Sequence, residues 1–358
     1  MTQNKLLSEG NFFEDFQLGQ TLIHGVPRTI TEGDASLYLA LTGSRYPLYC
    51  ARTVASNVGF EKVPLDNLLV FHIAFGKTVN DISLNAVANL GYAEAAFKIP
   101  CYAGDTLSVT SKVIGLKENS NGKTGVVYVH SSAANQHGEL VISWKRWVMV
   151  HKKQRDSNSD ASENYLPELK QQVEFHQQQL PSTINFSGWK EHYSDSQAKF
   201  DDLDIGDVLV HRDGITINDS DHSLATRLYQ NNARVHFDQA MMDSSPHGKR
   251  LVYGGHIISI CRALSYNGLG NGIWLSAING GTHCNPSFAG DTIYCQSEIL
   301  DKQPIEGRND LGLVRIRMIG IKNNTPDKIE TLYSTDNSRT RYHADVVLDL
   351  DYTVMMII

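Results

Sequence analysis

The chain reads Phe-Glu-Asp-Phe-Gln-Leu-Gly-Gln-Thr-Leu at residues 13–22 and Phe-Asp-Asp-Leu-Asp-Ile-Gly-Asp-Val-Leu at residues 200–209. The two stretches lie 187 positions apart, the difference between 200 and 13. Further along, Pro-Cys-Tyr-Ala-Gly-Asp-Thr at residues 100–106 is matched by Pro-Ser-Phe-Ala-Gly-Asp-Thr at residues 286–292, with an offset of 186. Agreement at separated places predicts two copies of one fold.

The repeat divides the 358 residues into a first copy over 10–151, a linker over 152–197 and a second copy over 198–358. A length near 150 residues is ordinary for one domain, so each copy is long enough to bury its own core. The linker is rich in Ser, Asn, Gln and Lys and has little periodic apolar pattern, which is typical of a connecting segment.

Composition and charge exclude several classes of protein. The net charge of −7 and the pI near 6.0 leave no broad basic field, so nucleic acid is not an expected partner. No apolar run is long enough to span a bilayer, and the first residues lack the apolar core of a signal peptide. The five cysteines form no CxxC pair. We therefore expect a cytoplasmic protein with reduced thiols and no membrane partner.

Both copies show the same coarse order of elements. A strand comes first, then a short helix behind a polar N-cap, then a long apolar helix, and β-rich segments close the copy. We expect strands at 21–31, 125–134, 140–150, 208–218, 292–300, 313–321 and 346–355. We expect short helices at 36–41 and 223–229 and apolar helices at 69–81 and 254–266. A long helix wrapped by a largely antiparallel sheet is an α+β arrangement.

The helix expected at 254–266 has apolar residues over much of its circumference, which predicts burial. It begins with Gly254 and Gly255, and glycine lets a ligand approach the backbone closely. Unpaired N–H groups at a helix N-terminus carry partial positive charge. Both glycines are therefore candidates for an oxyanion hole, although a tight turn would use the same residues.

An amide and a histidine stand five positions apart before this helix. His236 titrates near neutrality, so it can take a proton from water, and Asn231 can orient that water or a thioester oxygen. Arg234 can pair with a carboxylate or a phosphate of a ligand. The alternatives are a packed histidine, a turn amide and a solvated arginine. Tyr253 and Ser259, beside and inside the helix, are weaker candidates for substrate binding.

The first copy lacks this pair. With the 187-residue offset, Asn231 and His236 fall on Ser44 and Tyr49, so no imidazole stands at the equivalent position. We expect one active site per chain, in the second copy. The first copy would bind part of the ligand or only complete the core.

These motifs resemble those of the MaoC-like (R)-specific enoyl-CoA hydratases of the hotdog fold. Within that class they are most similar to the mesaconyl-CoA hydratases, also called β-methylmalyl-CoA dehydratases. The pair Asn231 and His236, the glycine-led helix and the Ala-Gly-Asp-Thr turn follow one another in the family's order. The closer likeness covers both copies and is carried by the stretches 10–16, 27–34, 69–79, 89–93, 123–130, 227–231, 251–262 and 346–354.

The resemblance implies a double hotdog fold and a hydro-lyase that reversibly adds water to mesaconyl-CoA, giving β-methylmalyl-CoA. It implies an acyl-CoA thioester as substrate, with no metal and no redox cofactor beyond the coenzyme A that the substrate carries. Hotdog folds usually pair through their sheets, so the resemblance also implies further homo-oligomerisation.

The chain departs from the generic hydratase motif at one catalytic position, because Asn231 stands where that motif has aspartate. Mesaconyl-CoA carries a free carboxylate on the carbon that receives water, and a second carboxylate beside it in a secluded site would be unfavourable. Our interpretation is that Asn231 keeps the shape and removes the charge. Arg234 or Arg45 would then hold the substrate carboxylate.

Three other functions fit parts of the pattern. The chain could be an (R)-specific hydratase of another enoyl-CoA, since the sequence does not show the shape of the acyl pocket. A hotdog thioesterase commonly uses Asp or Glu on or near the buried helix, and residues 254–266 contain neither. A non-catalytic acyl-CoA binding protein would have degenerate sites, which describes the first copy but not the second.

Overall fold

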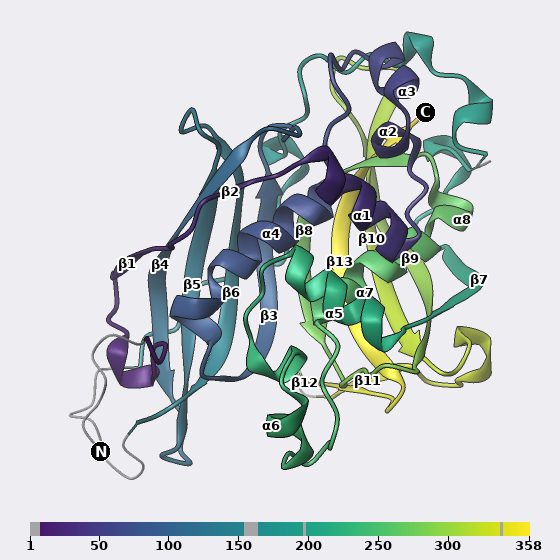
Figure 1. The fold of residues 1–358 in the computed structure, drawn as a ribbon. Coiled ribbons are helices and arrows are strands. Elements are labelled where there is room, and N and C mark those ends of the chain that lie inside the picture. The colour runs from purple at the N-terminus through teal and green to yellow at the C-terminus, as the bar shows by residue number, and fades with distance from the viewer. Residues whose placement is uncertain (1–7, 154–163, 196–197, 337–338) are drawn as a thin grey trace.

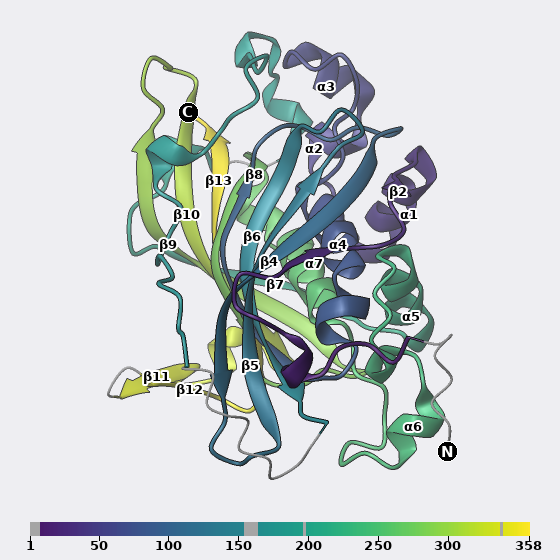
Figure 2. The same cartoon turned by 90° about the vertical axis from the view of Figure 1, so that its left-hand side faces the viewer.

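The computed structural model describes residues 8–153, 164–195, 198–336 and 339–358. Two repeats lie side by side, each with one long helix packed against its own half of a curved sheet (Figure 1). One face of the sheet is covered by the helices α1 (Glu32–Thr42), α4 (Asn67–Lys77), α5 (Asp219–Leu228) and α7 (Gly254–Leu264) (Figure 2). The architecture is the expected α+β double hotdog.

Within the described residues the main sheet has eleven strands, and neighbouring strands are antiparallel. The first repeat contributes β1 (Thr21–Ile23), β2 (Arg28–Thr29), β3 (Ala86–Phe97), β4 (Thr106–Glu118), β5 (Thr124–Ala134) and β6 (Leu140–His151). The second contributes β7 (Val208–Thr216), β8 (Gly272–His283), β9 (Thr292–Pro304), β10 (Leu311–Lys322) and β13 (Val346–Ile357). A separate hairpin consists of β11 (Tyr333–Asp336) and β12 (Arg339–Tyr342).

The strand order is symmetric about the junction of the two repeats. The order β1-β4-β5-β6-β3 meets β8-β13-β10-β9-β7, so β3 and β8 join the two half-sheets. At this junction Tyr92 pairs with Gly281 and Ala95 pairs with Ile278. Tyr92 and Ile278 are 186 positions apart, as are Ala95 and Gly281. The offset of 186 residues between the two copies in the sequence therefore also relates equivalent positions in the two halves of the sheet.

Shorter helical segments connect these elements. The α-helical ones are α2 (Pro47–Cys50), α3 (Arg52–Asn57), α6 (Gln239–Asp243) and α8 (Tyr266–Leu269). The 3-10 turns are η1 (Phe13–Asp15), η3 (Phe175–Gln177), η4 (Phe186–Gly188), η5 (Glu191–Tyr193), η6 (Phe200–Asp202), η7 (Arg234–His236) and η8 (Pro326–Lys328). Among the helices of the described residues, none is long and apolar enough to cross a membrane.

Several predicted boundaries are wrong. The short helices expected at 36–41 and 223–229 begin at Glu32 and Asp219, and the helix expected at 254–266 ends at Leu264. The apolar helix expected at 69–81 already ends at Lys77, where the π-helical turn η2 (Val79–Ser83) follows α4. The strand expected at 21–31 splits into β1 and β2, because Val26 has a φ of +61° and Pro27 has no N–H for a strand ladder. The central strands β3 and β8 were not among the strands expected from the sequence.

The two long helices lie in the core, as their composition predicted. Every residue of α4 is buried, and so is every residue of α7 after Gly254. A polar network joins them, because Nε2 of His72 lies 2.9 Å from Oγ of Ser259 and Tyr38 donates to the same hydroxyl at 3.0 Å. Such buried polar groups need partners, and here they supply them to one another.

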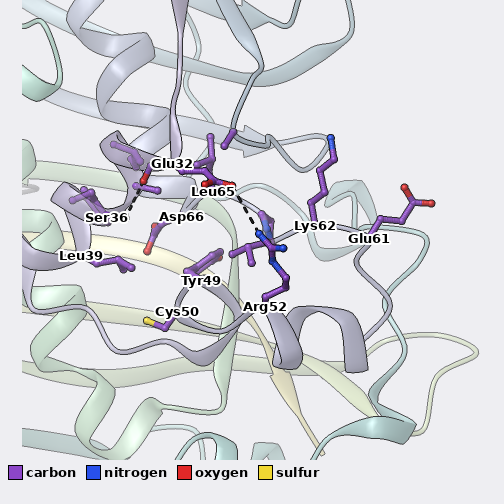
Figure 3. A pocket seen from close by; sticks show the side chains of 16 residues that line it. Glu32, Ser36, Leu39, Tyr49, Cys50, Arg52, Glu61, Lys62, Leu65 and Asp66 are labelled. Carbon is purple, nitrogen blue, oxygen red and sulfur yellow. Dashed lines mark hydrogen bonds and ion pairs between the residues drawn. The ribbon is translucent and has the colours of Figure 1, made fainter.

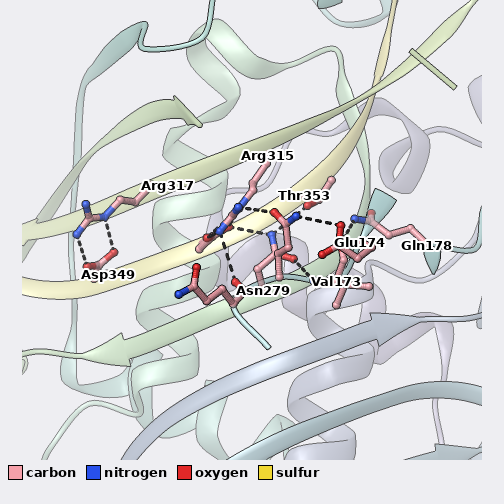
Figure 4. A network of polar contacts seen from close by, with 11 residues as sticks. Val173, Glu174, Gln178, Asn279, Arg315, Arg317, Asp349 and Thr353 are labelled. Atoms are coloured by element: carbon pink, nitrogen blue, oxygen red, sulfur yellow. Dashed lines mark hydrogen bonds and ion pairs between the residues drawn. The ribbon is translucent and has the colours of Figure 1, made fainter. Parts of the chain in front are cut away.

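The linker residues around Val173 are bound to the sheet on the side away from α4 and α7 (Figures 2 and 4), whereas residues 183–188 pack against the end of α3. The N–H of Val173 donates to Oδ1 of Asn279 in β8 at 2.9 Å. Nearby, the guanidinium of Arg315 in β10 forms an ion pair with Asp351 of β13 and also binds Gln172 of the linker. Gln172 and Val173 of the linker are thus fixed to strands of the second repeat.

Candidate active site

The amide of Asn231 lies in the loop that follows α5. Asn231 is 2% exposed, and its Oδ1 accepts the N–H of Ala233 at 3.0 Å, while its own N–H donates to the carbonyl of Thr226 at 3.1 Å. The C-terminal end of α4 presses against this loop, since a Cβ on Gly76 would lie 1.9 Å from the carbonyl oxygen of Tyr229. Only glycine permits that approach, so the first repeat helps to position Asn231.

His236 ends the turn η7 and is half-buried. Its Nδ1 lies 2.9 Å from the carbonyl oxygen of Leu251. Because a carbonyl can only accept, we assign the hydrogen to Nδ1, which leaves the lone pair on Nε2. Burial lowers the pKa of His236 to about 4, so the ring is neutral at cellular pH. A neutral imidazole with Nε2 available can accept a proton from water.

The N-terminus of α7 lies beside this imidazole. Tyr253 is the N-cap residue, but its side chain makes no capping hydrogen bond. Its ring packs against the ring of His236 with the centroids 5.7 Å apart. The first N–H groups of α7, at Gly254 and Gly255, are therefore not satisfied by a side-chain cap and can stabilise an oxyanion. His236, Tyr253 and the glycine pair come together as predicted.

Ser259 and Arg45 are not part of this cluster, whereas Arg234 lies in the same turn η7 as His236. Ser259 lies in the interior of α7 with its hydroxyl bonded to His72 and Tyr38, so it holds the core rather than the substrate. The guanidinium of Arg45 lies 4.8 Å from the ring centroid of Tyr266, beyond the C-terminus of α7 and thus at the opposite end from His236. Arg234 is exposed and forms no ion pair within the described residues.

Three polar side chains near the site were missed by reasoning from the sequence. His283, the last residue of β8, lies with its Cε1 2.4 Å from where a Cβ on Gly254 would stand. Tyr92 of β3 bonds to His283, although the two residues are 191 positions apart. Lys77 bonds to Gln230, and burial lowers the pKa of this lysine to about 8. No motif spacing reveals such pairs, because the fold alone brings them together.

The first repeat holds a pocket of about 580 Å³ at the position equivalent to the active site (Figure 3). Tyr49, the counterpart of His236, and Asp66, the N-cap of α4, both line it. Burial raises the pKa of Tyr49 well above its usual value and raises that of Asp66 to about 7. No histidine is among its lining residues in the described chain, and a ligand-binding role for this pocket stays a prediction.

A double hotdog with an imidazole beside the N-terminus of its buried helix is the scaffold of a MaoC-like hydratase. The model of the mesaconyl-CoA hydratase family matches residues 2–340, and the chain belongs to that family. It is a hydratase/dehydratase of the hydro-lyase class. The resemblance drawn from the sequence is confirmed.

Relatives cover nearly the whole chain. The β-methylmalyl-CoA dehydratase of Chloroflexus aurantiacus is 51% identical over 347 residues, which are 97% of either chain. The mesaconyl-CoA hydratase of Cereibacter sphaeroides is 44% identical over 347 residues, covering 97% of this chain and 98% of the relative. A solved MaoC-domain dehydratase structure from Chloroflexus aurantiacus has a TM-score of 0.93 at 50% identity and covers 98% of both chains. A Mycobacterium tuberculosis protein with a double hotdog fold has a TM-score of 0.72 over 98% of this chain and 99% of its own; at 21% identity it shows the fold alone.

Proposed function

We propose that this chain reversibly adds water to mesaconyl-CoA to give β-methylmalyl-CoA. The observation that carries the proposal is the neutral imidazole of His236, with Nε2 available, beside the uncapped N–H groups that begin α7. The names of the two relatives that are 51% and 44% identical support the acyl group. Since the likeness to them spans both repeats, it covers the helices and loops that form the site.

In the proposed reaction these groups act in the following order. Nε2 of His236 takes a proton from water while the water oxygen bonds to the carbon that carries the free carboxylate. The electrons of the C=C bond shift to the thioester oxygen, where the N–H groups of Gly254 and Gly255 stabilise the enolate. The proton on His236 then passes to the carbon next to the thioester. The product contains all the atoms of the water, and the imidazole is neutral again.

Asn231 and Arg234 have supporting parts in this proposal. The N–H of Ala233 holds Oδ1 of Asn231, which leaves the amide hydrogens of that side chain to position the water. Arg234 lies two positions before His236, is exposed, and makes no ion pair in the described part of the chain, so it is free to bind the substrate carboxylate. Its guanidinium suits a carboxylate because the two groups can form paired hydrogen bonds.

The proposal needs no resident metal or redox group, because water, imidazole and backbone amides supply the chemistry and coenzyme A enters with the substrate. The five cysteines are free thiols in the described residues, which supports a reducing compartment such as the cytoplasm as the place of the proposed reaction.

The test is hydration of mesaconyl-CoA by the purified protein, measured beside crotonyl-CoA and a His236→Ala variant. We expect turnover of mesaconyl-CoA and a loss of about 100- to 10,000-fold in the variant. Turnover of crotonyl-CoA alone would overturn the assigned acyl group and keep the hydratase. No hydration of either thioester would overturn the lyase activity in favour of a binding protein.

A further inference from the structure

A second imidazole, that of His283, lies at the same helix N-terminus as His236. Its ring is stacked against the backbone of Gly254, because a Cβ there would lie 2.4 Å from Cε1, 2.5 Å from Nε2 and 2.6 Å from Nδ1. Burial, with a smaller contribution from the neighbouring His236, lowers the pKa of His283 to about 4. The two histidines are therefore neutral neighbours at the N-terminus of α7.

The hydrogen on His283 can be assigned from its partner. The hydroxyl of Tyr92, from β3 of the first repeat, lies 2.8 Å from Nε2 of His283. Tyr92 is 2% exposed, and burial raises its pKa, so its hydroxyl stays protonated and must donate. Within the described residues Nε2 is its hydrogen-bond partner, so Tyr92 donates to Nε2 and the ring hydrogen sits on Nδ1.

The two imidazoles thus offer opposite hydrogen-bonding groups to the site, one an acceptor and the other a donor. His236 has its hydrogen held by the carbonyl of Leu251 and offers a lone pair at Nε2. His283 has its lone pair held by Tyr92 and offers an N–H at Nδ1, which has no protein partner among the described residues. One ring is equipped to accept a proton, and the other to donate a hydrogen bond.

Neither imidazole is repeated in the first copy. The offset of 186 that relates β3 to β8 places His283 opposite Phe97, just as Tyr49 stands opposite His236. A structural role at the joint of the repeats would be needed equally in both halves. The histidine is instead confined to the half that has the base, which indicates a role in the reaction.

We propose that Nδ1–H of His283 donates a hydrogen bond to the thioester oxygen of the substrate, and that Tyr92 is the positioning residue that sets its tautomer. The inference rests on the proposed hydratase reaction. As water adds, negative charge develops on that oxygen, and a fixed neutral donor in a buried site stabilises it together with the N–H groups of Gly254 and Gly255. The first repeat therefore contributes to catalysis through Tyr92.

Two substitutions separate this role from packing. The amide nitrogen of asparagine is as many bonds from Cα as Nδ1 of histidine, whereas that of glutamine corresponds to Nε2. We expect His283→Gln to lower kcat for mesaconyl-CoA by about 100- to 1,000-fold, and His283→Asn to retain at least tenfold more activity than His283→Gln. Tyr92→Phe should lower kcat with little change in KM. His137→Gln, at an exposed histidine in a turn, is the matched control.

A second measurement does not depend on turnover. The infrared carbonyl stretch of bound butyryl-CoA, a thioester that cannot take up water, should lie at lower frequency in the wild type than in His283→Gln. Equal kcat and equal carbonyl frequencies in the two proteins, or no advantage of Asn over Gln at unchanged thermal stability, would overturn the inference. If the wild type hydrated neither mesaconyl-CoA nor crotonyl-CoA, the proposed function would fail. The carbonyl frequency of bound butyryl-CoA would still test whether His283 donates a hydrogen bond to the thioester oxygen.

Discussion

At the scale of single residues, the feature that sets this chain apart is the amide at Asn231. The generic motif of the hydratases that it resembles has an aspartate there, and the buried amide instead takes an N–H from Ala233 and adds no charge. His236 is neutral as well, and residues 231–236 contain no carboxylate that would face the substrate carboxylate.

We expect Asn231→Asp to lower kcat/KM for mesaconyl-CoA by about 10- to 100-fold, because two carboxylates some 5 Å apart at low effective dielectric repel one another by a few kcal/mol. Crotonyl-CoA, which lacks the carboxylate, is the control substrate, and its kcat/KM should change much less. Higher activity of the variant on mesaconyl-CoA would contradict the repulsion argument.

The protonation of His236 predicts the acid side of the pH profile. Since burial lowers its pKa to about 4, the free enzyme should keep the base neutral down to that region. We expect kcat/KM for mesaconyl-CoA to stay level from pH 8 to about 5.5 and to fall only as the pH approaches 4. An inflection near 6.5, the value of an unperturbed histidine, would show that the site is more hydrated than the structure indicates.

At the scale of elements, the site depends on how the end of α4 meets the loop of Asn231. The contact joins one repeat to the other, because Gly76 belongs to the first and Tyr229 to the second. The backbone atoms are so close that no side chain fits between them.

We expect Gly76→Ala to destabilise the protein by about 1–3 kcal/mol and to lower kcat/KM, because the new Cβ must push away the Tyr229 carbonyl and the adjoining Asn231. The measurement is chemical denaturation together with hydratase activity. Gly33→Ala in α1 is the matched control, since the nearest atom to its Cβ would be 3.5 Å away and alanine favours helices. Equal behaviour of the two variants would contradict the close packing.

At the scale of the whole molecule, the interior holds several histidines that stay neutral. Burial lowers the pKa to about 3 in His72 and to about 4 in His236, His256 and His283. The unfolded chain binds protons at these rings near pH 6.5, before the folded chain does. Their contribution to stability is therefore present above about pH 6.5 and is lost as the pH falls toward 4.

We expect the midpoint of thermal unfolding to fall steadily between pH 6.5 and 4.5. Asp66 opposes this trend, because its pKa is raised to about 7 and the folded state binds its extra proton in that range, but it is one group against four. Replacing exposed His137 by Gln should leave the curve unchanged. A midpoint that is flat or rises on acidification would contradict the buried neutral state of these rings.

Much of this organisation was readable in the amino-acid sequence. The similar stretches at 13–22 and 200–209 predicted two copies of one fold. Each copy needs turn residues and apolar residues at the same relative positions. Local order predicted the buried helix and its glycine start. His236 was predicted as the base because it follows Asn231 by five positions, in one short loop that also contains Arg234. These are features that neighbouring residues determine.

Only the tertiary structure decided which residues from distant stretches share the site. Strands β3 and β8 were not predicted, because both lie in the middle of the sheet and lack the alternation that marks a strand with one exposed face. The β3–β8 junction brings Tyr92 to His283. Helix and loop packing decides the contact of Gly76 with Tyr229 and the position of Arg45 beside Tyr266, beyond the far end of α7. Spacing along the chain carries no information about such contacts, since burial and sheet register bring the groups together across more than 150 residues.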